Sequence, residues 1–204
     1  MRRVLLLLMV AVAFGCETKE EKLPIYGLSD VNDAGDTIYH QVADFSFLNQ
    51  DSVLITQKAV EDKIYVADFF FTTCPTICPV MKTQMLRVYE KYEHNPDVLI
   101  LSHSIDPKHD SVAVLREFAE RLGVSSDKWH FMTGDKDKTF KLGQTSYMVT
   151  TMDDPTAPGG LLHSGAFILV DKSRRVRGVY DGTDEEAVTR LLVDMDKLLN
   201  EYAK

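Results

Sequence analysis

Two of the three cysteines in the chain, Cys74 and Cys78, are separated by only three residues and are the first candidates for chemistry. A disulfide between residues this close would close almost no loop, so it would remove little entropy from the unfolded chain and stabilise the fold very little. Thiolates, in contrast, serve disulfide exchange or bind soft metal ions. We therefore predict a chemical role for the pair, in preference to two incidental buried cysteines.

The residues around this pair predict a strand-to-helix junction. An almost continuous apolar run over residues 64–71 is typical of a strand buried on both faces, and apolar residues then recur at helical spacing to about residue 93. Pro79 is well tolerated as the first helical residue, so the helix is predicted to begin there. The N–H groups and the dipole of a helix N-terminus favour a thiolate. Both sulfurs should face one exposed mouth, with more room between them for a metal than the common Cys-x-x-Cys motif leaves.

Strands and helices alternate along the rest of the chain. The predicted elements are a hairpin over residues 37–47 and 52–56 that turns at 49–51, strands at 98–105 and 129–132, helices at 115–122 (ended by Gly123) and 136–142, a loop at 150–160, a hairpin of strands 166–170 and 176–180, and a C-terminal helix opened by a capping box at 183–186. This order predicts an α/β, thioredoxin-like fold, in which helices flank a central mixed sheet that carries an N-terminal hairpin and an inserted strand-helix unit. The cysteines then lie at the carboxyl end of a central strand, where open α/β sheets usually place their sites.

His163 is the histidine that this layout brings to the cysteines. It precedes the strand at residues 166–170, which in a thioredoxin layout passes beside the cysteine pair. Redox thioredoxins place a cis-proline there, whereas this chain has no proline between Gly159 and Asp171 and offers an imidazole instead. Two thiolates and one imidazole match the softness of Cu(I), which accepts three ligands, while structural Zn(II) would want a fourth. Water or a carboxylate such as Asp106 could complete a tetragonal Cu(II) site.

The other histidines are expected to have ordinary roles. Those in polar or edge contexts should be solvated or make a single hydrogen bond: His40, His94, His109 and His130. His103 ends the second core strand and could approach the mouth, but histidines at strand ends are more often structural.

The first residues have the layout of an export signal. Arg2 and Arg3 precede an apolar run over residues 4–14, which is too short for a bilayer core that needs roughly 20 residues. Cys16 follows Gly15 and resembles the lipid-bearing cysteine of a bacterial lipoprotein, although an uncleaved anchor or a mis-set start codon are alternatives. We predict a signal peptide over residues 1–15, a tether over 16–23 and one domain over 24–204. The protein would be exported to the periplasmic side and held there by lipid on Cys16.

Charge argues against a nucleic-acid partner. The formal net charge is −8, and loss of Arg2 and Arg3 with the signal would take it to −10. A chain this acidic repels phosphate backbones.

These features together resemble the Sco/SenC family of thioredoxin-fold copper proteins, which assist maturation of the binuclear CuA site of cytochrome c oxidase. The resemblance covers about residues 44–199. It is carried by Val66-Ala-Asp-Phe-Phe-Phe-Thr-Thr-Cys-Pro-Thr-Ile-Cys-Pro79, Ser104-Ile-Asp-Pro-Lys-His-Asp-Ser111, Trp129-His-Phe-Met-Thr-Gly-Asp135, and His163 ahead of Phe167-Ile-Leu-Val-Asp171. It implies that Cys74, Cys78 and His163 bind copper, that the cysteines can cycle between dithiol and disulfide, and that the protein works at the outer face of an energy-conserving membrane.

Three functions fit this sequence. The leading hypothesis is a metallochaperone, a binding protein and not an enzyme, which passes Cu(I) to the cysteines of cytochrome c oxidase subunit II. The alternative is a thiol:disulfide oxidoreductase that uses Cys74 and Cys78 as a redox pair to reduce target cysteines outside the cytoplasm. A thiol peroxidase acting through Cys74 is a third, less favoured reading, and it predicts turnover of hydroperoxide by this cysteine.

Overall fold

The structure is a computed structural model and describes residues 22–203. The predicted signal peptide, Cys16 and most of the predicted tether lie outside these residues. Among residues 22–203, no helix is both long enough and apolar enough to cross a membrane.

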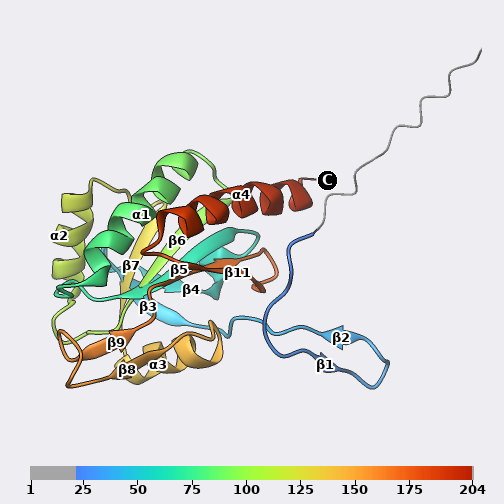
Figure 1. Cartoon of the computed structure of the whole chain (residues 1–204), viewed down its shortest axis with the longest axis horizontal. Helices are drawn as coiled ribbons and strands as arrows, with labels where there is room; N and C mark the ends of the chain where they lie inside the picture. Colours follow the sequence, from blue (N-terminus) through green and yellow to red (C-terminus); the bar gives the residue numbers. More distant parts are fainter. Residues whose placement is uncertain (1–21, 204) are drawn as a thin grey trace, which may run out of the picture.

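A seven-stranded mixed sheet forms the centre of the molecule, in the order β11-β10-β5-β6-β7-β3-β4 (Figure 1). Its strands are β3 (Ser46–Asn49), β4 (Leu54–Thr56), β5 (Ile64–Phe70), β6 (Val98–Ser104), β7 (Trp129–Thr133), β10 (Ala166–Val170) and β11 (Val176–Asp181). The three middle strands β5, β6 and β7 are parallel, whereas the hairpins β10–β11 and β3–β4 join antiparallel at either side. This arrangement confirms the predicted mixed sheet.

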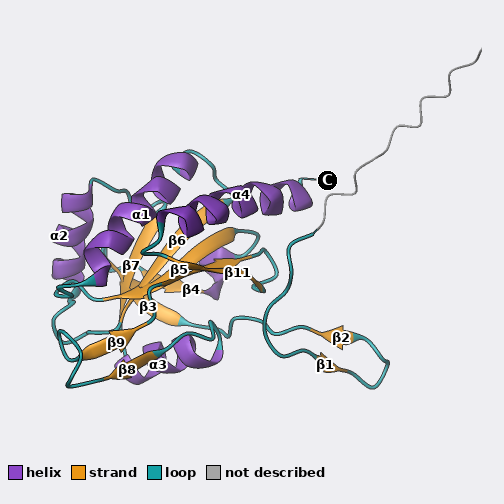
Figure 2. Cartoon of the chain, in the orientation of Figure 1, coloured by secondary structure: helices purple, strands orange, loops and turns teal. Residues whose placement is uncertain are grey.

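Helices cover both faces of the sheet (Figure 2). Three lie on one face, namely α1 (Ile77–Tyr92), α2 (Val112–Leu122) and α4 (Glu185–Tyr202), while α3 (Lys136–Thr145) and the small hairpin of β8 (Thr151–Asp153) and β9 (Leu161–His163) lie on the other. A short 3-10 helix, η1 (Gln57–Val60), follows β4. The pair β7–α3 corresponds to the predicted inserted strand-helix unit.

The two central strands explain why the core lies where it does. Every residue of β5 and of β6 is buried. Because successive side chains of a strand point to opposite faces, Phe70 packs toward α2, where its ring lies 5.7 Å from that of Phe118, and Phe69 packs toward α3. A strand buried on both faces needs apolar residues throughout, which is the pattern that identified β5 in the sequence.

Four local predictions need correction. The first strand of the N-terminal hairpin begins at Ser46 and not at residue 37, because Val42 donates its N–H to the carbonyl of Arg174 and holds the preceding segment against the β10–β11 turn. Helix α1 begins at Ile77, ahead of Pro79. The predicted loop over residues 150–160 contains β8, and Asp184 caps α4 in place of Thr183.

The described chain enters the domain beside the end of α4. Arg177 donates hydrogen bonds to the carbonyls of Leu23 (2.7 Å) and Pro24 (3.0 Å), and it pairs with Asp171 at 3.0 Å and with Glu201 at 2.9 Å. A two-stranded ladder of β1 (Asp30–Val31) and β2 (Thr37–Ile38) then projects from the body before β3 (Figure 1). We call the contacts of Arg177 the arginine clasp.

Candidate metal centre

The three predicted ligands meet at one edge of the sheet. Cys74 lies in the turn after β5, Cys78 in the first turn of α1, and His163 at the end of β9. All three are buried, and their ligand atoms lie within 4.8 Å of one another. The Sγ of Cys78 is 3.1 Å from Nε2 of His163. Elements far apart in the sequence therefore converge on one cluster.

The start of α1 determines the environment of Cys74. Thr76 is the N-cap residue but its side chain makes no capping hydrogen bond, so the first N–H groups of the helix remain available. Burial raises the pKa of the Cys74 thiol, but hydrogen bonds from the backbone N–H groups of Thr76 and Cys78 and from the side chains of both residues outweigh it. The net effect lowers the pKa of Cys74, so this residue carries the more readily formed thiolate.

Cys78 behaves in the opposite way. Burial strongly raises the pKa of its thiol, and a hydrogen bond from the backbone N–H of Phe71 compensates only in part. The thiol hydrogen of Cys78 can therefore be donated to Nε2 of His163. A cation that binds here must displace this proton, and its affinity should rise with pH.

Hairpin β8–β9 sets the orientation of His163. Thr151 pairs with His163 in the ladder, and Ser164 donates its N–H to the carbonyl of Thr150 at 3.0 Å. Nδ1 of His163 donates to the carbonyl of Ser164 at 3.1 Å, which assigns the proton to Nδ1 and leaves the lone pair of Nε2 for a ligand. Burial lowers the pKa of His163, so the ring is neutral near pH 7.

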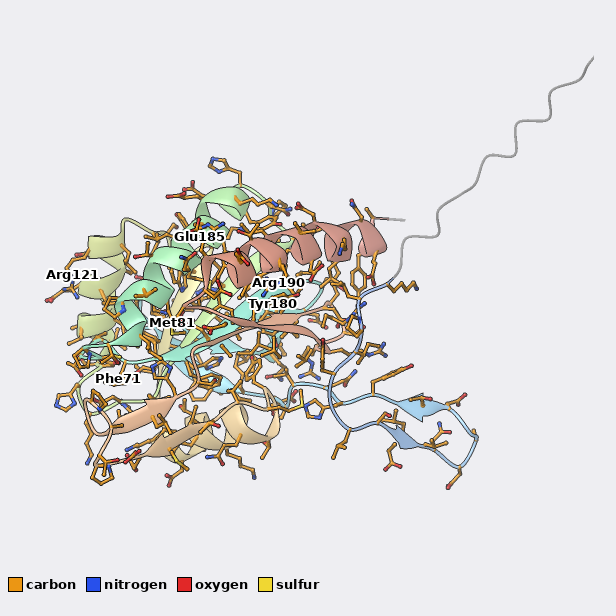
Figure 3. The ribbon with its side chains drawn as sticks, viewed as in Figure 1. Phe71, Met81, Arg121, Tyr180, Glu185 and Arg190 are labelled. Atoms are coloured by element: carbon orange, nitrogen blue, oxygen red, sulfur yellow. The ribbon has the colours of Figure 1, made fainter. Side chains whose placement is uncertain are left out.

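Phe71 supports the imidazole from behind. Its ring meets that of His163 edge to face, with centroids 5.9 Å apart, and it lies between the start of α1 and β9 (Figure 3). Gly159, in the turn between β8 and β9, packs on the same ring: a Cβ there would lie 2.7 Å from Cε2 of Phe71, and φ is +83°. Only glycine fits this approach without displacing the ring.

A buried ion pair below the cysteines was missed by sequence reasoning. Lys82, one helical turn after Cys78, donates to Asp68 at 2.7 Å and to Ser102 at 3.1 Å, and Trp129 donates from its indole to Ser102 at 2.8 Å. Lys82 and Asp68 are 3% and 0% exposed. The only signal in the sequence was a charged residue on the otherwise apolar face of α1.

Asp106 does not join the cluster. Its carboxylate instead contacts Nδ1 of His109 at 2.6 Å, so the suggested carboxylate ligand is not supplied by this arrangement. His40 bonds the carbonyl of Ser146 and His130 the side chain of Asn49, as expected for structural histidines.

His103 is structural but has an unusual environment. It is 1% exposed, and neither ring nitrogen has a hydrogen-bond partner. Its ring stacks on Phe69 at 5.1 Å and meets the edges of Phe45 and Phe47 at 6.0 and 5.5 Å. Burial lowers the pKa of His103 to about 3, so it is neutral at physiological pH.

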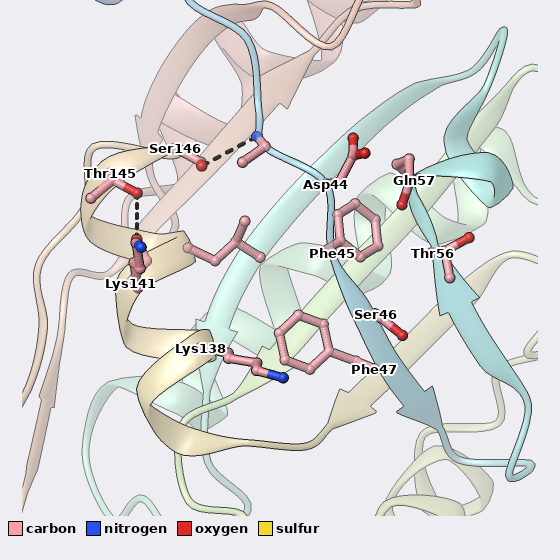
Figure 4. A pocket seen from close by; sticks show the side chains of 12 residues that line it. Asp44, Phe45, Ser46, Phe47, Thr56, Gln57, Lys138, Lys141, Thr145 and Ser146 are labelled. Atoms are coloured by element: carbon pink, nitrogen blue, oxygen red, sulfur yellow. Dashed lines mark hydrogen bonds between the residues drawn. The ribbon is translucent and has the colours of Figure 1, made fainter.

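Two hollows differ in their relation to the cysteines. The larger, about 530 Å³, lies between β3–β4 and α3 and is lined by residues such as Phe45, Phe47 and Lys138 (Figure 4). None of the three clustered ligands lines it. The smaller, about 270 Å³, contains Cys74 and Cys78 in its wall.

The donor atoms of the cluster suit two kinds of chemistry. Because two thiols and an imidazole are soft to borderline donors, the cluster suits a soft metal ion with few ligands. Because both cysteines are free thiols, it also suits disulfide exchange.

Comparisons with known proteins agree on one family. The family model described as SCO1/SenC matches residues 34–199. The SCO1 protein homolog of Bacillus subtilis is 29% identical over 161 residues, which cover 78% of this chain and 83% of that protein. The crystal structure of a SCO1/SenC family lipoprotein from Bacillus anthracis has a TM-score of 0.71 at 27% identity and covers 78% of this chain and 95% of that one. The structure of BsSco, described with a disulfide switch and as a member of the Sco family of cytochrome c oxidase assembly proteins, has a TM-score of 0.68 at 30% identity and covers 77% and 92%.

Proposed function

The chain belongs to the SCO1/SenC family, and on that premise we propose that it is a copper metallochaperone in which Cys74, Cys78 and His163 bind Cu(I). The observation that carries this proposal is the convergence of the three ligand atoms within 4.8 Å. Cu(I) accepts three soft ligands, whereas a structural Zn(II) site would take four. Among the described residues, no further His, Cys, Asp or Glu joins this group.

The bound ion is the cargo, and the cysteines of cytochrome c oxidase subunit II are its proposed acceptors. Cys74 is the better placed donor for ligand exchange, because hydrogen bonds lower the pKa of its thiol whereas burial raises the pKa of Cys78. Transfer would then build the CuA site. The protein acts in this proposal as a binding protein and not as an enzyme.

The proposal also includes the cellular location of the protein. Residues 1–15 act as a signal peptide, lipid on Cys16 anchors the protein on the periplasmic side of a membrane, and residues 16–23 tether the domain over 24–204. Family likeness to a protein described as a lipoprotein supports this anchor. Replacement of Cys16 by serine should release the protein from membranes, and an unchanged membrane fraction would contradict it.

Thiol:disulfide exchange is the second candidate. The lowered pKa of Cys74 and the free thiols of both cysteines favour it. A site must be reduced before it takes copper, so the two activities are compatible.

The deciding experiment is an anaerobic Cu(I) titration of the reduced protein against a competing chelator. We expect one equivalent to bind. In His163→Ala, affinity should fall by at least roughly tenfold, since loss of even an outer-shell partner typically costs 10–100-fold. His130→Ala is the matched control, because this histidine is half-buried and lies outside the cluster. Binding that is indifferent to His163 would move the assignment to the reductase.

A further inference from the structure

A hollow of about 270 Å³ opens beside the cysteines, between α1 and α2. Cys74 and Cys78 line one end of it. Further along it is walled by apolar side chains of the two helices, namely Pro79, Leu86, Phe118 and Leu122. We call this hollow the α1–α2 slot.

The slot offers almost nothing to a polar or charged ligand. Apart from the cysteines, its one ionisable lining group is Lys82, which is 3% exposed and already paired with Asp68 at 2.7 Å. Two hydroxyls also line the slot, and both are already donated: that of Thr72 to the carboxylate of Asp110, and that of Thr83, on the rim, to the carbonyl of Pro79 at 3.1 Å. A polar group placed here would lose its water without gaining a partner, whereas an apolar group would be stabilised.

The size and position of the slot limit further which kind of group can occupy it. The volume is below the roughly 300–1,000 Å³ of typical small-molecule sites, so the slot suits one or two side chains better than a cofactor. It is continuous with the sulfurs, so a molecule that exchanges with Cys74 also covers the slot. Two exposed apolar residues lie close to the cysteines in the sequence, Pro75 directly after Cys74 and Val80 two positions after Cys78, which favours a polypeptide with apolar residues around its own cysteine.

We propose that the α1–α2 slot receives a bulky apolar side chain from the partner segment that brings its cysteine to Cys74. This inference rests on the proposed function, in which the sulfurs exchange with partner cysteines, and it adds a recognition element to that exchange. Full burial of one such side chain corresponds to roughly a tenfold to hundredfold gain in affinity. The slot would thus select among partner segments.

The test uses the reduced protein and symmetric disulfides of two short capped peptides. In one peptide a phenylalanine stands on each side of the cysteine, separated from it by one residue. The other peptide has serine at these two positions. The Cys74 thiolate attacks a peptide sulfur and expels one peptide thiolate, which takes up a proton. Cys78 then loses its thiol proton and displaces the second peptide, so the dithiol is oxidised to a disulfide and the peptide disulfide is reduced to two thiols. Hydroxyethyl disulfide, too small to reach along the slot, gives the reference rate for each variant.

Two variants block the slot in different ways, and one is the control. Thr83→Trp fills it from the exposed rim, and Leu122→Gln makes its wall polar. Val193→Gln replaces an apolar residue that is 49% exposed on α4, outside the slot. We expect the phenylalanine peptide to react about 10–100 times faster than the serine peptide with the native chain and the control, after correction by the reference. In both slot variants this ratio should fall to within about twofold of one.

A ratio near one in the native chain, failure to exchange with either peptide, or a ratio that survives both slot variants would overturn the inference. Cu(I) titration of the same proteins is read separately. Loss of copper binding with the peptide preference intact would remove the metallochaperone and leave the slot, whereas intact copper binding without a preference would do the reverse.

Discussion

Replacement of His103 by phenylalanine should stabilise the protein increasingly as the pH falls. In the folded protein the ring is enclosed by aromatic side chains and has a pKa of about 3, whereas an unfolded chain has a histidine pKa of about 6.5. Because the folded pKa is the lower one, the unfolded state binds the proton first. The stability that depends on the neutral ring is present in full above about pH 6.5, and it is lost progressively as the pH falls toward about 3.

The size of this loss follows from the two pKa values. Each pH unit between them costs about 1.4 kcal/mol, so at pH 5 the native protein should have lost about 2 kcal/mol through this residue alone. His103→Phe has no such group. The difference in the free energy of unfolding between variant and native protein should therefore grow by about 2 kcal/mol between pH 7.5 and pH 5. His130 and His163, whose pKa values are also lowered, are present in both proteins and cancel in the comparison.

Urea unfolding followed by circular dichroism, on reduced metal-free protein at both pH values, measures this difference. His94→Phe is the control, since it makes the same substitution at a histidine that is exposed on the surface. A constant difference at both pH values would refute the reasoning, whatever its size. It would mean that His103 is protonated in the folded state or has a partner there.

Two further predictions concern the support of the cluster. Lys82→Ala should destabilise the fold by about 3–5 kcal/mol in urea unfolding, because the buried Asp68 carboxylate loses its cationic partner and keeps only the hydrogen bond from Ser102. Adding Asp68→Asn should restore much of the loss, and equal losses in the single and double variants would contradict this. Gly159→Ala should weaken Cu(I) binding more than Gly160→Ala in a chelator competition. Both positions have positive φ, but only a Cβ at Gly159 would meet Phe71, and equal effects would show that this contact does not matter.

The sequence was sufficient to predict which three side chains the structure brings together, namely Cys74, Cys78 and His163. Only three residues separate Cys74 from Cys78, so any strand-to-helix turn places them together. His163 is far away in the sequence, but the strand that follows it pairs with β5. The topology of a mixed α/β sheet then brings it to the carboxyl end of β5, and this rule requires no knowledge of side-chain contacts.

Contacts between distant elements account for what sequence reasoning missed. The residues around Thr151 have the composition of a loop, but Thr151 donates to the carbonyl of Phe140 and accepts from Gln144, so α3 holds β8 in place. At α4, Thr183 is already bonded to the carboxylate of Asp181, and this leaves Asp184 to cap the helix. The pairing of Lys82 with Asp68 likewise has no local pattern, because it depends on how α1 lies across the sheet.

The arginine clasp and the cysteines lie at opposite ends of the central sheet. Arg177 holds Leu23 near Asp171, and Asp171 follows Val170, the partner of Tyr65 at the start of β5. The cysteine mouth lies at the other end of that strand, roughly 20 Å away for seven residues. Any attachment through the N-terminus would therefore hold the molecule at the end of the sheet opposite the cysteines. A partner would meet the cysteine end, so the distance from the point of attachment at which the thiols can act includes the length of the sheet.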